Sequence, residues 1–216
     1  MKDEYSYAYG KNSHIPARRY SYNSRLEMLR RSLAGDGLVL DVGSATGDYA
    51  IDLWNDGCDI ICCDIDSESL KTLRTKQRSL DAVKGDAAGL PFMDEAFRTI
   101  ISLNAFRYFL DGLESLREFH RILKPNGLLV LLDHNRLCPD SLILTNDVVR
   151  YYTLAEMREM LNKTGYKILA EEFVFVPPTW IPANTVNAVS RCMNRLGAFC
   201  ISTVYPEFLI RAARRE

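Results

Sequence analysis

Apolar runs that alternate with amphipathic stretches leave few folds open to this chain. Four nearly continuous apolar runs lie at residues 38–42, 59–64, 99–103 and 127–133. Runs without polar alternation are typical of strands whose two faces are both covered, as in a parallel sheet. Because helical stretches lie between these runs, the pattern predicts an open, doubly wound α/β sheet.

Three helices have recognisable caps. One is predicted over 67–77 after Asp66, and a second over 113–123 after Asp111. A third, over 153–162, opens with the capping box formed by Thr153 and Glu156 and stops at Gly165. A last strand is expected over 208–212.

The two ends depart from this alternation within what we expect to be one domain over residues 1–216. Residues 1–24 are too polar for core. We expect residues 1–35 to form a helical segment, with Tyr9, Tyr20 and Tyr22 either closing over a pocket as a lid or packing on the sheet edge. Near the other end, prolines stiffen 177–182, and apolar residues recur at helical spacing over 186–200. We expect residues 177–205 to form an insert before the last strand.

Charge and cysteine content exclude several classes of protein. The 27 basic and 28 acidic residues give a formal charge of −1, whereas general nucleic-acid binders carry a basic excess. Cys62 and Cys63 are adjacent in a predicted strand and therefore point to opposite faces, so they cannot share a metal. The six cysteines include no CxxC pair, and we expect buried free thiols in a cytoplasmic protein without a membrane span.

A glycine-containing turn follows the first strand. The sequence Asp41-Val42-Gly43-Ser44-Ala45-Thr46-Gly47-Asp48 lets a ligand approach the backbone, and the following helix offers free N–H groups. An acid before such a turn repels phosphate and suits a cationic or amine-bearing ligand. The turn therefore argues against a dinucleotide site.

Acids also end the next two strands. Asp64 stands where a carboxylate can accept both hydroxyls of a ribose, and Asp86 could accept a hydrogen bond from an adenine amino group. Each acid alone could merely cap the next helix. Asp41, Asp64 and Asp86 together match the amine, the ribose and the base of one ligand.

Motifs in this order resemble the class I S-adenosylmethionine-dependent methyltransferases over about residues 36–175, and are most similar to the small-molecule branch with ubiquinone/menaquinone-type enzymes. They read LVLDVGSATGDYAIDL, CCDIDSESL, VKGDAAGLPFMDEAFRTIISLNAFRYF and LREFHRILKPNGLLVLLD. The resemblance implies a Rossmann-like, mostly parallel seven-stranded sheet with helices on both faces. It implies S-adenosylmethionine as cofactor, with S-adenosylhomocysteine as product, bound by Asp41, Gly43, Ser44, Ala45, Gly47, Asp64, Ile65, Asp86, Ala87, Asn104 and Phe106.

One residue departs from the family pattern. Ala45 stands where most members have the middle glycine of the turn, and its methyl group narrows the approach of the methionine moiety. With a negative φ this alanine would cost little.

Acid–base candidates are few. His134 directly follows the fifth strand at the expected substrate side, so we predict a substrate or acid–base role for it. Arg107 and Tyr108 follow the fourth strand and are candidates to line the acceptor pocket. No cluster has metal-ligand spacing, and we expect no metal.

These features predict methyl transfer to an O, N or C nucleophile of a small molecule, such as a quinone-like compound, a lipid or a sugar precursor. A non-catalytic S-adenosylmethionine-binding module or sensor is the alternative from another class, and an NAD-dependent oxidoreductase is disfavoured by Asp41. The run Asn104-Ala105-Phe106-Arg107 lacks the prolines of amine-directed nucleic-acid methylases, so no nucleic-acid partner is expected. Stable membrane insertion is not expected either, and a homodimer is compatible with the sequence.

Overall fold

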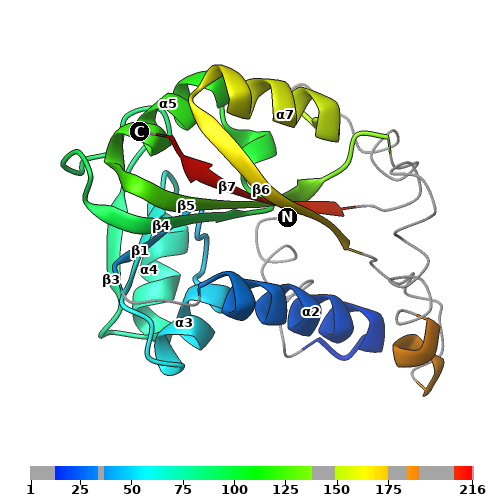
Figure 1. Cartoon of the computed structure of the whole chain (residues 1–216). Helices are drawn as coiled ribbons and strands as arrows, with labels where there is room; N and C mark the ends of the chain where they lie inside the picture. Colours follow the sequence, from blue (N-terminus) through cyan, green and yellow to red (C-terminus); the bar gives the residue numbers. More distant parts are fainter. Residues whose placement is uncertain (1–12, 34–36, 138–148, 175–183, 190–206, 216) are drawn as a thin grey trace.

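The computed structural model describes residues 13–33, 37–137, 149–174, 184–189 and 207–215. Seven strands form one sheet in the order β3-β2-β1-β4-β5-β7-β6 (Figure 1). Strands β1 to β5 pair in parallel, whereas β7 is antiparallel to both β5 and β6. The prediction of a Rossmann-like, mostly parallel seven-stranded sheet is therefore confirmed.

The strand bounds follow the apolar runs closely at the start of the chain. The strands are β1 Val39–Val42, β2 Ile60–Asp64, β3 Asp81–Lys84, β4 Phe97–Leu103, β5 Leu123–His134, β6 Tyr166–Val174 and β7 Glu207–Arg214. Strand β5 begins before the predicted run at residue 127, and its pairing with β4 shifts register between Phe97 and Thr99. The prediction of a last strand over 208–212 is confirmed by β7.

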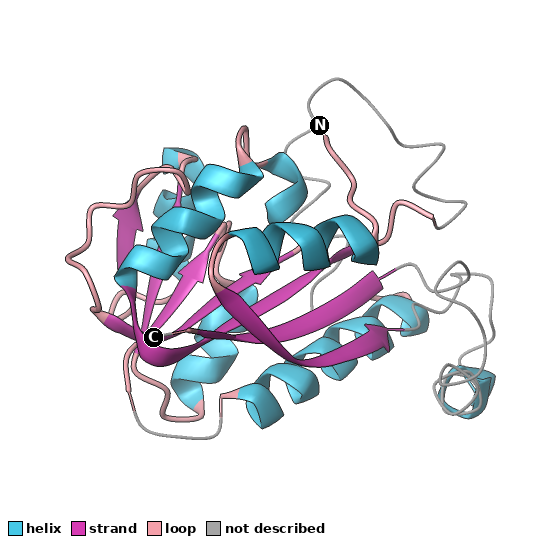
Figure 2. Cartoon of the chain, turned by 45° about the horizontal axis from the view of Figure 1, so that its top comes forward, coloured by secondary structure: helices cyan, strands magenta, loops and turns pink. Residues whose placement is uncertain are grey.

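Helices cover both faces of the sheet (Figures 1 and 2). They are α2 Pro16–Ser32, α3 Asp48–Asn55, α4 Ser67–Lys76, α5 Gly112–Ile122 and α7 Leu154–Lys163, with a 3₁₀ turn η1 at Phe106–Tyr108 and a further helical stretch at 184–189. Residues of α2, α3 and α4 pack in one core cluster, and residues of α5 and α7 pack in the other. Cys62 and Cys63 fall in different clusters, as their adjacency on β2 predicts.

The three predicted caps are present. The side chains of Asp66 and Asp111 accept hydrogen bonds from backbone N–H groups at the starts of α4 and α5. Thr153 and Glu156 form the reciprocal capping box of α7. Gly165 follows α7 with a φ of 85°, in the left-handed region that glycine tolerates best.

The N-terminal segment contributes more to the core than its polarity predicts. Helix α2 places Tyr22, Leu26 and Leu29 in the cluster between the helices and the sheet, and all three are buried. The expectation that residues 1–24 are too polar for core is therefore wrong for the start of α2, where Ala17 and Tyr22 are buried and the hydroxyl of Tyr22 finds partners.

Some sequence expectations fall on residues outside those described. They concern Tyr9, the proline-rich segment 177–182 and most of the helix expected over 186–200, of which residues 184–189 are helical. Within the described ranges, none of the helices has the length and apolar character to cross a bilayer.

Candidate functional site

A cavity of about 620 Å³ opens at the carboxyl ends of the parallel strands. Its lining comes from the segments that follow β1, β2, β3 and β4, from the end of β5, and from α2 and α3. Open α/β sheets bind ligands at this edge, where the strand order reverses. All the predicted site residues line this cavity except Gly47 and Phe106.

The turn after β1 is shaped by close contacts. Gly43 has a φ of 76°, and a Cβ atom there would lie 2.3 Å from the Cβ of Ala105, so no larger residue fits without displacement. Gly47 is the N-cap residue that precedes α3 and has a φ of 75°, and its missing side chain makes room for Leu73. Gly47 thus supports packing beneath the turn and does not reach the cavity.

Ala45 adopts a conformation that its residue type disfavours. Its φ is 47°, in the left-handed region, so the negative φ at which an alanine here would cost little is not adopted. In this conformation the Ala45 N–H donates to Oδ2 of Asp64 at 2.7 Å. The hydrogen bond made in this strained conformation therefore connects the turn after β1 to the end of β2.

Three acids approach the cavity in different environments. Asp41 is 3% exposed, and burial, followed by the charge of Asp64, raises its pKa to about 7. Asp64 accepts the N–H groups of Ala45 and Asp66, one on each carboxylate oxygen. Asp86 is exposed and accepts the N–H of Ala88. Each ionised carboxylate offers about four acceptor sites, so Asp64 and Asp86 retain capacity for a ligand.

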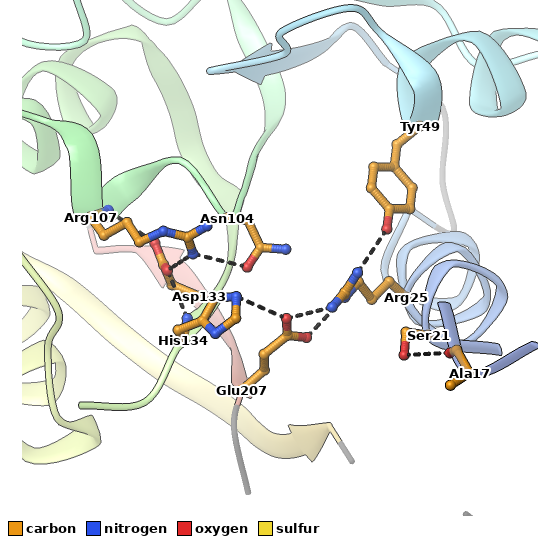
Figure 3. A network of polar contacts seen from close by, with 9 residues as sticks. All are labelled: Ala17, Ser21, Arg25, Tyr49, Asn104, Arg107, Asp133, His134 and Glu207. Atoms are coloured by element: carbon orange, nitrogen blue, oxygen red, sulfur yellow. Dashed lines mark hydrogen bonds and ion pairs between the residues drawn. The ribbon is translucent and has the colours of Figure 1, made fainter. Parts of the chain in front are cut away.

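Strand β4 ends in a strained asparagine. Asn104 has a φ of 55°, and its Oδ1 accepts a hydrogen bond from Nη1 of Arg107 at 3.2 Å. Nη1 of Arg107 also lies 2.6 Å from Oδ1 of Asp133, a buried ion pair (Figure 3). The amide group of Asn104 is therefore oriented, with its Nδ2 donors left for other partners.

Phe106 is fully buried and packs against the rings of Phe109 and Tyr152, each at 5.4 Å between centroids. The structure places it in the core behind the cavity, so the expectation that it edges the pocket does not match its position. Its neighbours Arg107, Tyr108 and Phe109 line the cavity instead.

His134 lies at the end of β5 and lines the cavity. Its side chain is 24% exposed, and its Nε2 lies 3.4 Å from Oε1 of Glu207 at the start of β7. Burial lowers the pKa of His134, while the charge of Glu207 acts in the opposite direction. The imidazole is therefore largely neutral at pH 7 and able to accept a proton.

Sequence reasoning missed the buried partners of this histidine. Glu207 is fully buried and receives two hydrogen bonds from Arg25 of α2, at 2.8 Å to Nε and 2.5 Å to Nη2 (Figure 3). Arg25 also contacts the hydroxyl of Tyr49 on α3 at 3.4 Å. Arg25 and Glu207 are 182 positions apart, and no local pattern signals such a contact.

Tyr22 is the member of the predicted tyrosine set that lines the cavity, whereas Tyr20 does not. The Tyr22 ring stacks on Tyr49 at 4.5 Å, and its hydroxyl lies 2.9 Å from the carbonyl oxygen of Asp48 and 2.8 Å from Oδ2 of Asp52. Among the residues with described positions, no cluster of His, Cys, Asp or Glu has the arrangement of a metal site.

Comparison with known proteins follows the same part of the chain. Residues 40–131 match a family described as a methyltransferase domain. A demethylmenaquinone methyltransferase from Renibacterium salmoninarum is 29% identical over 135 residues, which cover 62% of this chain and 57% of the relative. A ubiquinone/menaquinone biosynthesis C-methyltransferase UbiE from Shewanella sp. is 30% identical over 150 residues, which cover 64% of this chain and 60% of the relative. The matches thus span less than two thirds of the length of these curated relatives.

A solved structure shares the fold along nearly the whole chain. A methyltransferase from Thermotoga maritima, described as a possible histamine N-methyltransferase, has a TM-score of 0.70 with 19% identity and covers 92% of both chains. At this level of identity, the similarity shows that the two proteins share a fold.

Proposed function

We propose that the chain is a class I S-adenosylmethionine-dependent methyltransferase and that it transfers a methyl group from S-adenosylmethionine to a small, quinone-like acceptor. The observation that carries the proposal is the cavity that gathers the turn at 41–48 with Asp64, Asp86, Asn104 and His134. The matched relatives support a quinone-like acceptor.

The residues of the cavity fit this donor. The glycine cradle at Gly43 would receive the methionine part, and the buried Asp41, which lines the cavity, would attract its ammonium group. Asp64 would accept the ribose hydroxyls, while Asp86 and Ala87 would flank the adenine. Ile65 lies on the cavity wall next to Asp64 and is 60% exposed, and burial of this side chain under the base would add apolar contact.

The donor supplies a methyl group already activated by positive charge on sulfur. The protein's residues then have to align donor and acceptor and exclude water, and alignment can contribute roughly 7–11 kcal/mol of rate acceleration. Ring-bearing side chains from α2, α3, η1 and the segment before α7 line the part of the cavity that would receive a planar acceptor: Tyr22, Tyr49, Tyr108 and Tyr151.

His134 would serve as the base for an acceptor that is protonated at neutral pH. Its neutral imidazole would take the proton of the acceptor as the new bond to the methyl carbon forms and the bond from that carbon to sulfur breaks. The sulfur then leaves as a neutral thioether, so charge is balanced by the imidazolium.

Calorimetric titration with S-adenosylmethionine and S-adenosylhomocysteine tests the donor site, and a product assay on quinols, lipids and sugar precursors tests the reaction. We expect binding of both compounds and methylation of a quinol. Binding without turnover on any acceptor would favour the non-catalytic module, and absence of binding would refute the donor site.

A further inference from the structure

A buried chain of charged groups connects the two ends of the chain through the cavity floor (Figure 3). Arg25 of α2 forms a two-pronged ion pair with Glu207 of β7, and Oε1 of the same carboxylate faces Nε2 of His134 at 3.4 Å. Arg25 and His134 line the cavity, whereas Glu207 is fully buried behind them. Glu207 is thus the carboxylate that lies between the imidazole of His134 and the guanidinium of Arg25.

Packing alone does not account for this arrangement. Burying a carboxylate and a guanidinium costs several kcal/mol per ion, and replacing such a pair by apolar residues is often neutral or stabilising. The chain of charged groups from Arg25 through Glu207 also leads to His134, the one described histidine that lines the cavity. Buried charge arranged around a titratable group in a cleft points to a functional site.

We propose that Glu207 is a positioning residue that holds the Nε2 side of His134, so that Nδ1 remains the proton acceptor, and that Arg25 keeps Glu207 ionised for this task. The inference rests on the role of His134 in the proposed function. The carboxylate orients the imidazole and stabilises the imidazolium that forms when the acceptor gives up its proton. The 3.4 Å contact is long for a hydrogen bond, and such contacts commonly tighten when the ligand binds.

Other charged groups face the same imidazole. Asp133 of β5 accepts the backbone N–H of His134 at 2.7 Å, and Arg107 of η1 pairs with Asp133. Burial lowers the pKa of His134 most, then Glu207 raises it, Arg107 lowers it, Asp133 raises it and Arg25 lowers it. The ring of Tyr151 also faces the imidazole, with 6.2 Å between the ring centroids. Glu207 is therefore the strongest charge acting on His134, which makes its removal measurable.

The chain offers a clean measurement, since it has only three histidines, His14, His120 and His134. NMR titration of their imidazole signals in the protein without ligands gives each pKa directly. In Glu207→Gln we expect the pKa of His134 to fall by roughly one unit or more, because an opposite charge close to the ring is lost. His120, which packs on Tyr166 on the other side of the sheet, should titrate as in the wild type.

Two further variants keep the experiment decisive. Glu207→Gln leaves Arg25 buried without its partner, so the double variant Arg25→Met/Glu207→Gln removes both charges. In the double variant the pKa of His134 should still fall, but by less than in Glu207→Gln, because the weaker lowering effect of Arg25 on that pKa is removed as well. Glu172→Gln breaks a more exposed pair with Arg211 on the neighbouring strand and should leave the titration unchanged.

An unchanged titration of His134 in a folded variant lacking the Glu207 carboxylate would overturn the inference. This outcome is distinguishable from failure of the proposed function, because the titration needs neither donor nor acceptor. A wild-type protein that fails to bind S-adenosylmethionine would refute the donor site and leave the effect of Glu207 on His134 intact.

Discussion

Ala45 holds a backbone conformation that is unfavourable for any residue with a side chain. Its φ of 47° costs about 1–2 kcal/mol relative to a right-handed conformation, and glycine avoids most of that cost. Because the strained N–H donates to Asp64, the turn tolerates the strain in exchange for a fixed connection between β1 and β2.

Ala45→Gly should therefore raise the free energy of unfolding by about 0.5–1 kcal/mol, since part of the relieved strain is offset by the greater freedom of glycine in the unfolded chain. Denaturant titration measures this change. Glu95→Gly is a control for binding, because Glu95 has a φ of 56° outside the cavity; it relieves similar strain but also removes an ion pair with Arg214. Only Ala45→Gly should alter affinity for S-adenosylhomocysteine. A loss of stability in Ala45→Gly would contradict this account.

Asp64→Ala should weaken binding of S-adenosylmethionine by about 1–3 kcal/mol, because hydrogen bonds to a charged acceptor are lost. Calorimetry gives the affinity, and thermal unfolding reports separately on the turn that Asp64 holds. The exposed Asp59 precedes the same strand at its other end, so Asp59→Ala should bind as the wild type does. Equal affinities for the two variants would show that Asp64 does not contact the donor.

Helix α2 shows how an element enters the site through polar contacts. Tyr22 combines a stacked ring with a hydroxyl that reaches two oxygens of α3, and burial raises its pKa far above the ordinary value. The apolar runs and caps of the other elements are local signals and were predictable. The docking of α2 depends on contacts between distant residues, which no period of 2 or 3.6 encodes.

Tyr22→Phe should lower the free energy of unfolding by about 1–2 kcal/mol, because buried oxygens lose their hydroxyl partner while the ring contacts remain. Hydrogen exchange should become faster for the amides of α2 than for those of α5. Tyr20→Phe, on the same helix and away from the cavity lining, is the control and should leave exchange unchanged. Uniform acceleration across all helices would instead indicate global destabilisation.

At the scale of the whole molecule, the buried Asp41 makes folding depend on pH. Burial raises the pKa of Asp41 from its ordinary value of 3.8 to about 7, so the folded protein keeps a proton that the unfolded chain releases. The free energy of unfolding contributed by this group therefore falls as pH rises between these two values. Asp41, in the proposed donor site, thus lowers the stability of the folded protein as pH rises from about 4 to about 7.

Asp41→Asn removes this dependence while preserving shape. The difference in free energy of unfolding between the variant and the wild type should grow in favour of the variant by up to about 4 kcal/mol from pH 4 to pH 8. Urea titrations at several pH values measure it, with the exposed Asp59→Asn as control. A difference independent of pH would mean that Asp41 is ionised in the folded protein at low pH.

The class of the sheet was predictable from the sequence, whereas the order and pairing of its strands were predictable only in part. The runs that form β1, β2 and β4 are apolar on both faces, and the resemblance supplied the donor residues. Strand β6 lies at the edge of the sheet, and its charged residues Lys167, Glu171 and Glu172 interrupt the apolar pattern by which a strand is recognised. The charged groups beneath the cavity escaped prediction because Glu207 acquires its role only when β7 enters between β5 and β6.

The position of β7 sets the order in which the protein can mature on the ribosome. The carboxylate partner of Arg25 is translated 182 residues after the arginine itself. Until then the arginine must stay hydrated, and the edges of β5 and β6 that receive β7 are unpaired and open to wrong partners. Nascent chains that have not yet reached residue 207 are therefore expected to need chaperone protection, and the part of the cavity around His134 is completed only after translation of β7.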